Sequence, residues 1–259
     1  MNIFLYDGTF EGFLSAVFYA YDTKILPDRI TTHKHFQDSF FAEKYDIYTN
    51  EAYAKRIWSG LEKKTSKRIC QKVYRVFLSE IYDVEILIYK YLRLTFNATV
   101  NIDENYADQT VLDFNNVYKK VSMESHRAVM FIRFQKTADG IYYAPFDPAY
   151  NVLPLTIKHF KDRFSDQQWV IYDTRRNYGF HYDLTDVSEI RISNGTVNPF
   201  SGKVRKEHLD ENELDFQELW NDYFGAVNIK ERKNLKVHKQ FLPKRFWKYL
   251  PEKNFIKVD

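Results

Sequence analysis

The stretch AVMFIRFQKTADGIYYA, residues 128–144, decides the fold that we expect. Apolar residues before it recur at helical spacing, whereas inside it Met130, Ile132 and Phe134 occupy every second position, which is the period of a strand. Asp139-Gly140 then follows, and such a pair between two strand-like runs is the strongest short-range signal for a two-residue β-hairpin. The stretch therefore predicts an antiparallel hairpin that follows a helical region.

The residues after this hairpin predict further strands. A short helix is expected at about 155–164, because a preceding proline suits the first turn of a helix. Residues 169–173 and 180–183 then form a second hairpin around a turn near 177–179, and residues 187–192 add another strand.

The residues before the hairpin predict a mainly helical region. Residues 2–6 are typical of a short buried strand, and the apolar spacing over 10–22, 50–96 and 110–125 indicates helices. Strands and helices that do not alternate regularly argue for the α+β class. We expect an antiparallel sheet, formed by the hairpins in 128–192 plus the N-terminal strand and covered by helices.

The expected domain organisation has three parts. Residues 1–192 form an α+β core domain, and residues 193–210, rich in Asn-Gly, Asn-Pro and Ser-Gly pairs, form a loop. Residues 211–259 form a C-terminal helix and a basic aromatic tail that packs on the core.

Composition excludes several classes of site. No run of residues approaches the length of about 18 apolar residues that a membrane span needs, so we expect a cytoplasmic protein. Cys70 is the only cysteine among 259 residues, which excludes an internal disulfide and a zinc or iron–sulfur site built from this chain's thiolates. We expect a buried, inert thiol at Cys70, incidental histidines at His33 and His35, and no metal or other cofactor in this chain.

The turn at 7–12, between the first strand and the first helix, has two interpretations. The N-terminus of the helix could bind an anion. Alternatively, Gly8 turns the chain while Asp7 or Thr9 caps the helix. The second interpretation is favoured, because a full phosphate-loop pattern with its lysine is absent.

The last 34 residues, 226–259, carry most of the positive charge. They hold ten Lys or Arg against three acids, a net charge of +7, whereas the other 225 residues sum to −4. Cations set phosphate affinity and interleaved aromatic rings can stack on bases, so the tail predicts a nucleic-acid surface. Alternatively the tail folds back on the acidic body, with its aromatic residues buried, or binds a partner protein. The predicted nucleic-acid-binding residues are Lys230, Arg232, Lys233, Lys244, Arg245 and Lys248.

Four residues are candidates for catalysis. Asp173, Arg175 and His181 lie on the second predicted hairpin, where residues opposite each other on one face are about 5 Å apart. His126 precedes the first hairpin and could act as a general base oriented by Glu124 or Asp173. No motif of a serine hydrolase, a zinc protease or a dinucleotide-binding fold is present, so a self-sufficient enzyme is the less favoured interpretation.

Six blocks of the chain stand out when they are taken together. They are LYDGTFEGFL at 5–14, ESHR at 124–127, DGIYYAP at 139–145, WVIYD at 169–173, NIKERKN at 228–234 and LPKRFWKYLPE at 242–252. Together these blocks resemble an uncharacterised family labelled "probable DNA metabolism protein". The resemblance implies a function in DNA metabolism or repair, because genes of that family lie beside a radical-SAM protein thought to modify or repair DNA. It also implies a link to uracil-DNA glycosylase, to which the family's domain is fused in other chains.

Three functions remain open on the sequence. The first is a nucleic-acid-binding accessory protein that presents DNA to a partner enzyme, namely the radical-SAM protein that the resemblance implies. The second is an enzyme that acts on a nucleobase or nucleotide through the polar cluster of the second hairpin. The third is a protein-interaction module whose tail docks an acidic partner.

Overall fold

The computed structural model describes residues 1–36, 42–192, 203–229, 232 and 234–254. The chain forms two compact units, Met1–Ser122 and Met123–Asp259. The boundary falls inside one long helix, α5 (Gln109–Phe131), so the core domain that we expected over 1–192 is divided. No linker composition marks this boundary, because the helical pattern continues through it.

The sheet of unit 1 has three strands in the order β2-β1-β3, all of them parallel. The strands are β1 (Asn2–Tyr6), β2 (Arg29–Thr32) and β3 (Glu43–Asp46), and α1 (Phe10–Thr23) connects the first two. The expectation that the N-terminal strand joins the hairpins in an antiparallel sheet was therefore wrong. Parallel neighbours need a crossover connection, which α1 supplies here.

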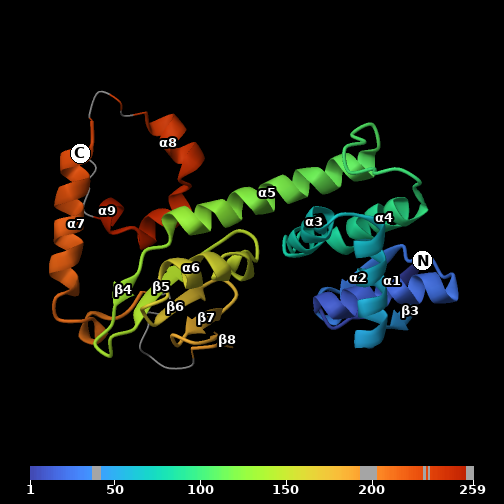
Figure 1. Ribbon diagram of the computed structural model, residues 1–259, viewed down its shortest axis with the longest axis horizontal. Coiled ribbons are helices and arrows are strands. Elements are labelled where there is room, and N and C mark those ends of the chain that lie inside the picture. Colours follow the sequence, from blue (N-terminus) through green and yellow to red (C-terminus); the bar gives the residue numbers. More distant parts are fainter. Residues whose placement is uncertain (37–41, 193–202, 230–231, 233, 255–259) are drawn as a thin grey trace. The chain divides into compact units, whose positions relative to one another are not determined.

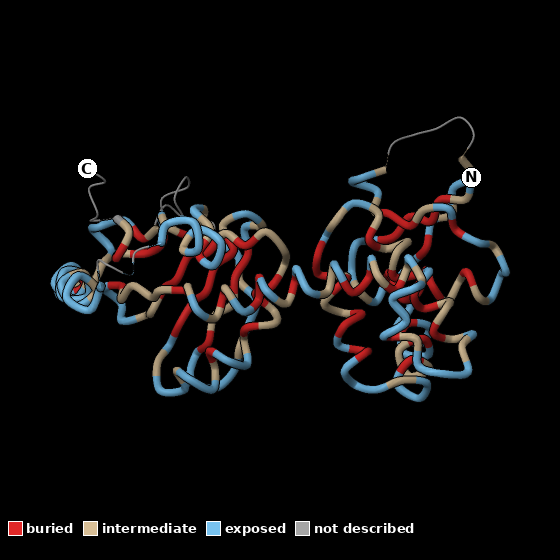
Figure 2. The backbone as a smooth tube through the Cα atoms, turned by 90° about the horizontal axis from the view of Figure 1, so that it is seen from above, coloured by how far each residue is buried: buried red, intermediate tan, exposed pale blue. Residues whose placement is uncertain are grey.

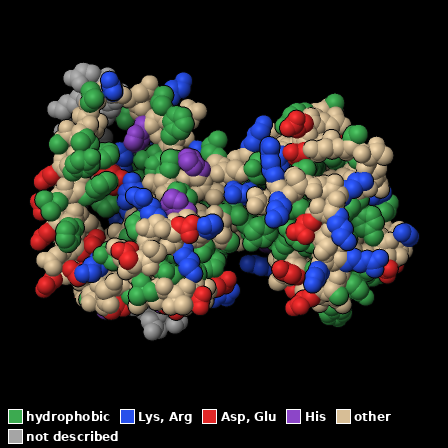
Figure 3. Space-filling model, viewed as in Figure 1, with side chains coloured by type: hydrophobic (Ala, Val, Ile, Leu, Met, Phe, Trp, Pro, Cys, Tyr) green, Lys and Arg blue, Asp and Glu red, His purple; other side chains and the backbone are tan. Residues whose placement is uncertain are grey.

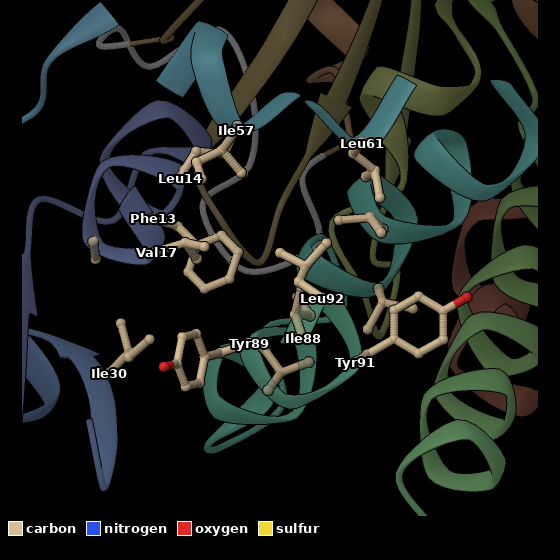
Figure 4. Packing of buried hydrophobic residues seen from close by; sticks show 14 of the residues in the cluster. Phe13, Leu14, Val17, Ile30, Ile57, Leu61, Ile88, Tyr89, Tyr91 and Leu92 are labelled. Carbon is tan, nitrogen blue, oxygen red and sulfur yellow. The ribbon is translucent and has the colours of Figure 1, made fainter. Parts of the chain in front are cut away.

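Helices build the remainder of unit 1, as the apolar spacing predicted (Figure 1). They are α2 (Glu51–Lys64), α3 (Lys67–Phe77), α4 (Val84–Asn97) and the first part of α5. Their apolar faces meet α1 and the sheet in one core, in which Phe13, Val17, Leu61 and Leu92 are buried. Figure 4 shows these side chains, from α1, α2 and α4, pointing into one interior.

The sheet of unit 2 has five strands in chain order, from β4 to β8. Three neighbouring pairs are antiparallel, but β5 (Tyr142–Phe146) and β6 (Trp169–Asp173) are parallel, with α6 (Ile157–Arg163) in the crossover between them. The sheet is therefore mixed and not purely antiparallel. The remaining strands are β4 (Gln135–Lys136), β7 (Tyr178–Tyr182) and β8 (Val187–Ile190).

The two predicted hairpins are present, but several boundaries differ: β7 begins at Tyr178 and not at residue 180, and the strand expected from about Met130 begins at Gln135. The second hairpin, β6–β7, pairs Trp169 with Tyr182 and Asp173 with Tyr178. The first hairpin turns at Asp139-Gly140, but α5 continues to Phe131 and leaves only two residues for β4. The class is thus α+β in the broad sense that the sequence predicted, with helices and two separate sheets.

The C-terminal segment packs on unit 2. It contains α7 (Glu213–Val227), α8 (Leu235–Phe241), a 3-10 helix (Lys244–Tyr249) and α9 (Pro251–Asn254). Phe246, Tyr249 and Leu250 are buried, whereas Phe241 is exposed. Residues 193–202 of the predicted loop 193–210 lie outside the described residues. The rest of this segment includes a short 3-10 helix, Lys206–His208.

No helix in the described ranges is both long enough and apolar enough to cross a lipid bilayer.

Candidate functional site

The carboxyl ends of β5 and β6 place several charged side chains together. Phe146 pairs with Asp173 in this parallel pair, so both strands leave the sheet at the same edge. Asp147 follows β5 directly, and Arg175 and Arg176 follow β6 within a few residues. In open sheets with parallel strands, ligands bind beyond the carboxyl ends of the strands. This edge of the sheet is therefore the position at which a ligand site is expected.

Asp173 organises the turn after β6. Its Oδ1 accepts hydrogen bonds from the backbone N–H groups of Arg175 (2.9 Å) and Arg176 (3.0 Å). Its Oδ2 accepts one from the Arg176 guanidinium, at 2.9 Å. Burial raises the pKa of Asp173, and the Arg176 guanidinium opposes this effect. Both carboxylate oxygens are thus occupied within the turn, so this residue holds the turn and Arg176 in place.

The two arginines of this turn reach the segment that follows β5. The Nε of Arg175 donates to Oδ1 of Asp147 at 2.9 Å. The Nη1 of Arg176 donates to the carbonyl oxygen of Pro148 at 3.2 Å. Two strand ends are thereby joined by guanidinium groups, whose planar donors hold a fixed geometry.

Glu124 is a second carboxylate beneath the same surface. It lies on α5 with 1% of its side chain exposed, and it is bound by Nη2 of Arg245 at 2.6 Å and 2.7 Å. Its Oε1 also accepts a hydrogen bond from the backbone N–H of Ala149 at 2.7 Å, and Arg127 lies 3.4 Å from its Oε2. One buried acid therefore joins α5, the segment after β5 and the C-terminal 3-10 helix.

Three cations of this region are partly exposed, whereas Arg127 and Arg176, at 18% and 14%, are about as covered as Asp147, at 19%. Exposed side-chain fractions are 48% for Arg175, 44% for Lys248 and 32% for Arg245. Those of Glu124 and Asp173 are 1% and 0%. The surface of this region is therefore positive. We call it the basic cluster: Arg127, Arg175, Arg176, Arg245 and Lys248, with Glu124, Asp147 and Asp173 as their acceptors.

Positive side chains also gather in the same unit beyond these residues. Figure 3 shows Lys, Arg and His side chains on unit 2 around the C-terminal end of α5. Lys244 and His126 are exposed. Lys244 thus adds positive charge beside the basic cluster, and His126 adds positive charge only when its imidazole is protonated.

The four predicted catalytic residues do not converge. His181 pairs with Val170, three residues from Asp173 along β6. Because successive side chains alternate between the faces of a strand, His181 and Asp173 lie on opposite faces of the sheet. His126 is exposed on α5, and Arg175 is bound to Asp147. Only Asp173 and Arg175 therefore share a site, and they share it as structural partners.

The predicted tail residues fall into three groups. Lys230 and Lys233 lie outside the described residues, and Arg232 is exposed. Lys244 is exposed at the start of the 3-10 helix. Arg245 and Lys248 belong to the basic cluster, where Nζ of Lys248 lies 3.8 Å from Oδ2 of Asp147.

The turn at 7–12 has the capping geometry and not that of an anion site. Thr9 caps α1, because its Oγ1 accepts a hydrogen bond from the backbone N–H of Gly12. Oδ1 of Asp7 accepts from the N–H of Thr9 at 2.9 Å, and its Oδ2 accepts from Thr49 at 2.7 Å. A carboxylate thus lies at the start of the helix, where it would repel an anion.

The remaining candidates for reactive or metal-binding roles are isolated. Cys70 is buried, as predicted, and burial raises the pKa of its thiol. His33 lies 3.4 Å from Asp46, and His35 lies 3.4 Å from the hydroxyl of Thr32. Within the described ranges, no three His, Cys, Asp or Glu side chains are grouped so that they could hold a metal ion.

The comparison with protein families gives one match. The family model described as a domain of unknown function, DUF4130, matches residues 82–252. The chain belongs to this family. The DUF4130 region begins just before α4 and includes every residue of the basic cluster, from Glu124 to Lys248. A search of curated proteins found no match to the chain.

Proposed function

We propose that this protein is a nucleic-acid-binding accessory protein of DNA metabolism or repair, which presents DNA to a partner enzyme. The observation that carries the proposal is the basic cluster, in which five cations outnumber three acids and in which Arg175, Arg245 and Lys248 are more exposed than the carboxylates. Phosphate groups dominate the affinity of proteins for nucleic acids. A surface of oriented guanidinium and ammonium groups matches that chemistry.

The buried carboxylates make the cluster better suited to phosphate than a mobile lysine run would be. Arg175 is held through its Nε by Asp147, and Arg245 through one Nη by Glu124. A guanidinium has five N–H donors, so each retains further donors for a phosphate oxygen. Because the side chains are already ordered, binding costs less conformational entropy.

The proposed partner is the radical-SAM protein that the family resemblance implies. Enzymes of that kind need an iron–sulfur cluster, which is held by several thiolates. This chain contributes one cysteine, Cys70, and it is buried. The division of labour that we propose therefore assigns the chemistry to the partner and the DNA contact to this protein.

The test is a salt titration of DNA binding by the full chain. Fluorescently labelled duplex DNA is titrated at several salt concentrations, and log affinity is plotted against log salt. Each cation that neutralises a duplex phosphate contributes about 0.9 to the slope. Arg175 and Lys248 of the basic cluster and the neighbouring exposed Lys244 are changed to Ala together. The slope should flatten by roughly 1 to 3 units, because Asp147 already neutralises part of the charge of Arg175 and Lys248.

The control variant removes the same charge from elsewhere in unit 2. It changes three exposed cations of α6 and of the 3-10 helix near residue 207 to Ala, and its slope should equal that of the wild type. An unchanged slope in the cluster variant, with binding intact, would remove the basic cluster from the interface. The control substitutions are Lys158→Ala, Arg163→Ala and Lys206→Ala.

The enzyme alternative has less geometric support. Both oxygens of Asp173 are engaged in the turn, and His181 lies on the other face of the sheet. Incubation of the protein alone with damaged or modified oligonucleotides would test this alternative. Turnover without the partner would favour it over the accessory role.

A further inference from the structure

Helix α7 presents an apolar stripe to solvent. Phe216, Leu219, Tyr223 and Val227 lie at helical spacing on one side, with exposed fractions of 64%, 63%, 59% and 53%. Glu213 is the one buried residue of this helix. Figure 2 shows α7 end-on at the left edge, almost wholly in the colour of exposed residues. A helix with such a stripe normally covers a core, so this stripe lacks its counterpart.

Acidic side chains flank the stripe. Asp215, Glu218 and Asp222 are exposed and follow one another at three- and four-residue spacing, so they form a row along α7. Residues 211–227 hold five acids and neither Lys nor Arg. In the described part of the chain, none of these three side chains has an ion-pair partner. Figure 3 shows acidic and hydrophobic side chains side by side along the left edge, where α7 runs.

Helix α8 shows the opposite charge beside a second apolar face. Val237 and Phe241, four residues apart, are 44% and 62% exposed. Lys236 and Lys239 are exposed on the same short helix, but at about 100° per residue Lys239 lies on the side opposite Val237 and Phe241. The backbone of α8 is held on unit 2, because Arg127 donates a hydrogen bond to the carbonyl oxygen of Gln240 at 3.0 Å. One edge of α8 is therefore tied to α5, while its lysines and two apolar side chains stay exposed.

We propose that α7 docks on α8 of a second copy of this chain. An acidic helix and a basic helix that both expose apolar side chains are complementary in charge, and exposed apolar patches of this kind mark interaction sites. In a two-fold dimer the contact occurs twice, because α7 of each copy meets α8 of the other. Packing of α7 against α7 is disfavoured, because it would bring the two acidic rows together.

The test uses two charge-reversal variants of the full chain and sedimentation velocity. The first variant carries Asp215→Lys, Glu218→Lys and Asp222→Lys, so both of its helices are basic. The second carries Lys236→Glu and Lys239→Glu, so both of its helices are acidic. The wild type should form dimers that high salt weakens, and each variant alone should be monomeric.

Mixing the two variants gives the decisive measurement. In the mixed pair, a basic α7 faces an acidic α8 at one contact and an acidic α7 faces a basic α8 at the other. An equimolar mixture should therefore recover the dimer, a result that misfolded variants could not give. A wild type that stays monomeric, a variant that dimerises alone or a mixture that stays monomeric would each overturn the proposal.

A single apolar substitution gives an independent check. Phe216→Glu places a charge at the N-terminal end of an exposed stripe, so the fold should survive, while the dimer dissociates. Leu184→Glu, at a residue of unit 2 that is 47% exposed, is the matched control and should leave the dimer intact. Equal behaviour of the two variants would contradict the assignment of the interface to α7.

Discussion

Phe246→Ala should lower the free energy of unfolding of unit 2 by about 3–5 kcal/mol, the usual cost of deleting a buried phenylalanine ring. Phe246 lies in the C-terminal 3-10 helix and is fully buried. Its ring stacks on Phe146 of β5, with centroids 4.5 Å apart and an interplanar angle of 13°. Stacked aromatic pairs add about 0.5–1.5 kcal/mol beyond the burial of area. We therefore expect a loss in the upper half of the range.

The assay is equilibrium unfolding in urea, followed by tryptophan fluorescence. Three of the four tryptophans, Trp169, Trp220 and Trp247, belong to unit 2. A chain of two units can unfold in two transitions, so the comparison uses the transition that these tryptophans report. Phe241→Ala is the matched control, because Phe241 is 62% exposed and its loss should change stability by less than about 0.5 kcal/mol.

The reasoning is refuted if Phe246→Ala lowers the free energy of unfolding no more than Phe241→Ala does. If Phe246→Ala costs less than about 1 kcal/mol, the ring does not anchor the tail, since small losses are typical of exposed positions. The stacking on Phe146 would then carry no stability.

Three further predictions concern other parts of the two units. Glu124→Ala should destabilise unit 2 by about 3–5 kcal/mol in urea unfolding, because it leaves a guanidinium without its buried partner. Gly12→Ala should lower the free energy of unfolding by about 1–3 kcal/mol, because a Cβ at this position would lie 2.2 Å from Oδ1 of Asp7. Gly225→Ala on α7 is the matched control: a Cβ there would have no atom within 4 Å, so stability should be unchanged or slightly higher. Burial raises the pKa of Glu85, so the folded protein holds this proton more tightly than the unfolded chain does. The free energy of unfolding should therefore fall as the pH rises from the pKa of Glu in the unfolded chain, about 4.3, through the pKa of Glu85 in the folded protein. Glu85→Gln should abolish that part of the pH dependence, and a stability profile identical to that of the wild type would contradict the assignment.

Local signals in the sequence predicted most helices and strands, but they could not predict how strands that are distant in the sequence pair. Asp139-Gly140 determines its own turn, so the first hairpin was predicted in the right place. Its loop has three residues, 138–140, and not the two that we expected, because Thr137 pairs with Ile141. The parallel pair β5–β6 depends on the crossover through α6, and a buried strand has the same apolar pattern in either orientation. Likewise β3, with the sequence EKYD and mostly exposed residues, carries no strand pattern that could have revealed the sheet of unit 1.

The candidate site was predicted in part: its exposed cations and Asp173 were named as site residues, but Glu124 and Asp147 were not. Arg175, Arg245 and Lys248 were identified from charge density and from the second hairpin. Glu124 was considered only as a residue that orients His126, because its true partner lies 121 residues away in the chain. Arg176 has the same chemistry as Arg175 in the sequence, and only the fold shows which of the two is buried beside Asp173.

Positive residues that cluster in the sequence do not necessarily form a positive surface in the folded protein, because acids from other segments can pair with them. This pairing determines which cations are available to bind a phosphate. The tail is strongly basic, yet Arg245 lies on Glu124 and Lys248 lies near Asp147, both outside the tail. A cation neutralised by a buried acid contributes less to the salt dependence of binding than one whose charge is uncompensated. The exposed Lys244 should therefore affect the salt slope more than Arg245 does, although the two are adjacent in the sequence. Single substitutions compare them directly: Lys244→Ala should flatten the slope without loss of stability, whereas Arg245→Ala should mainly lower stability, because it strands Glu124. The opposite pattern would mean that the buried acids do not set the charge of this surface.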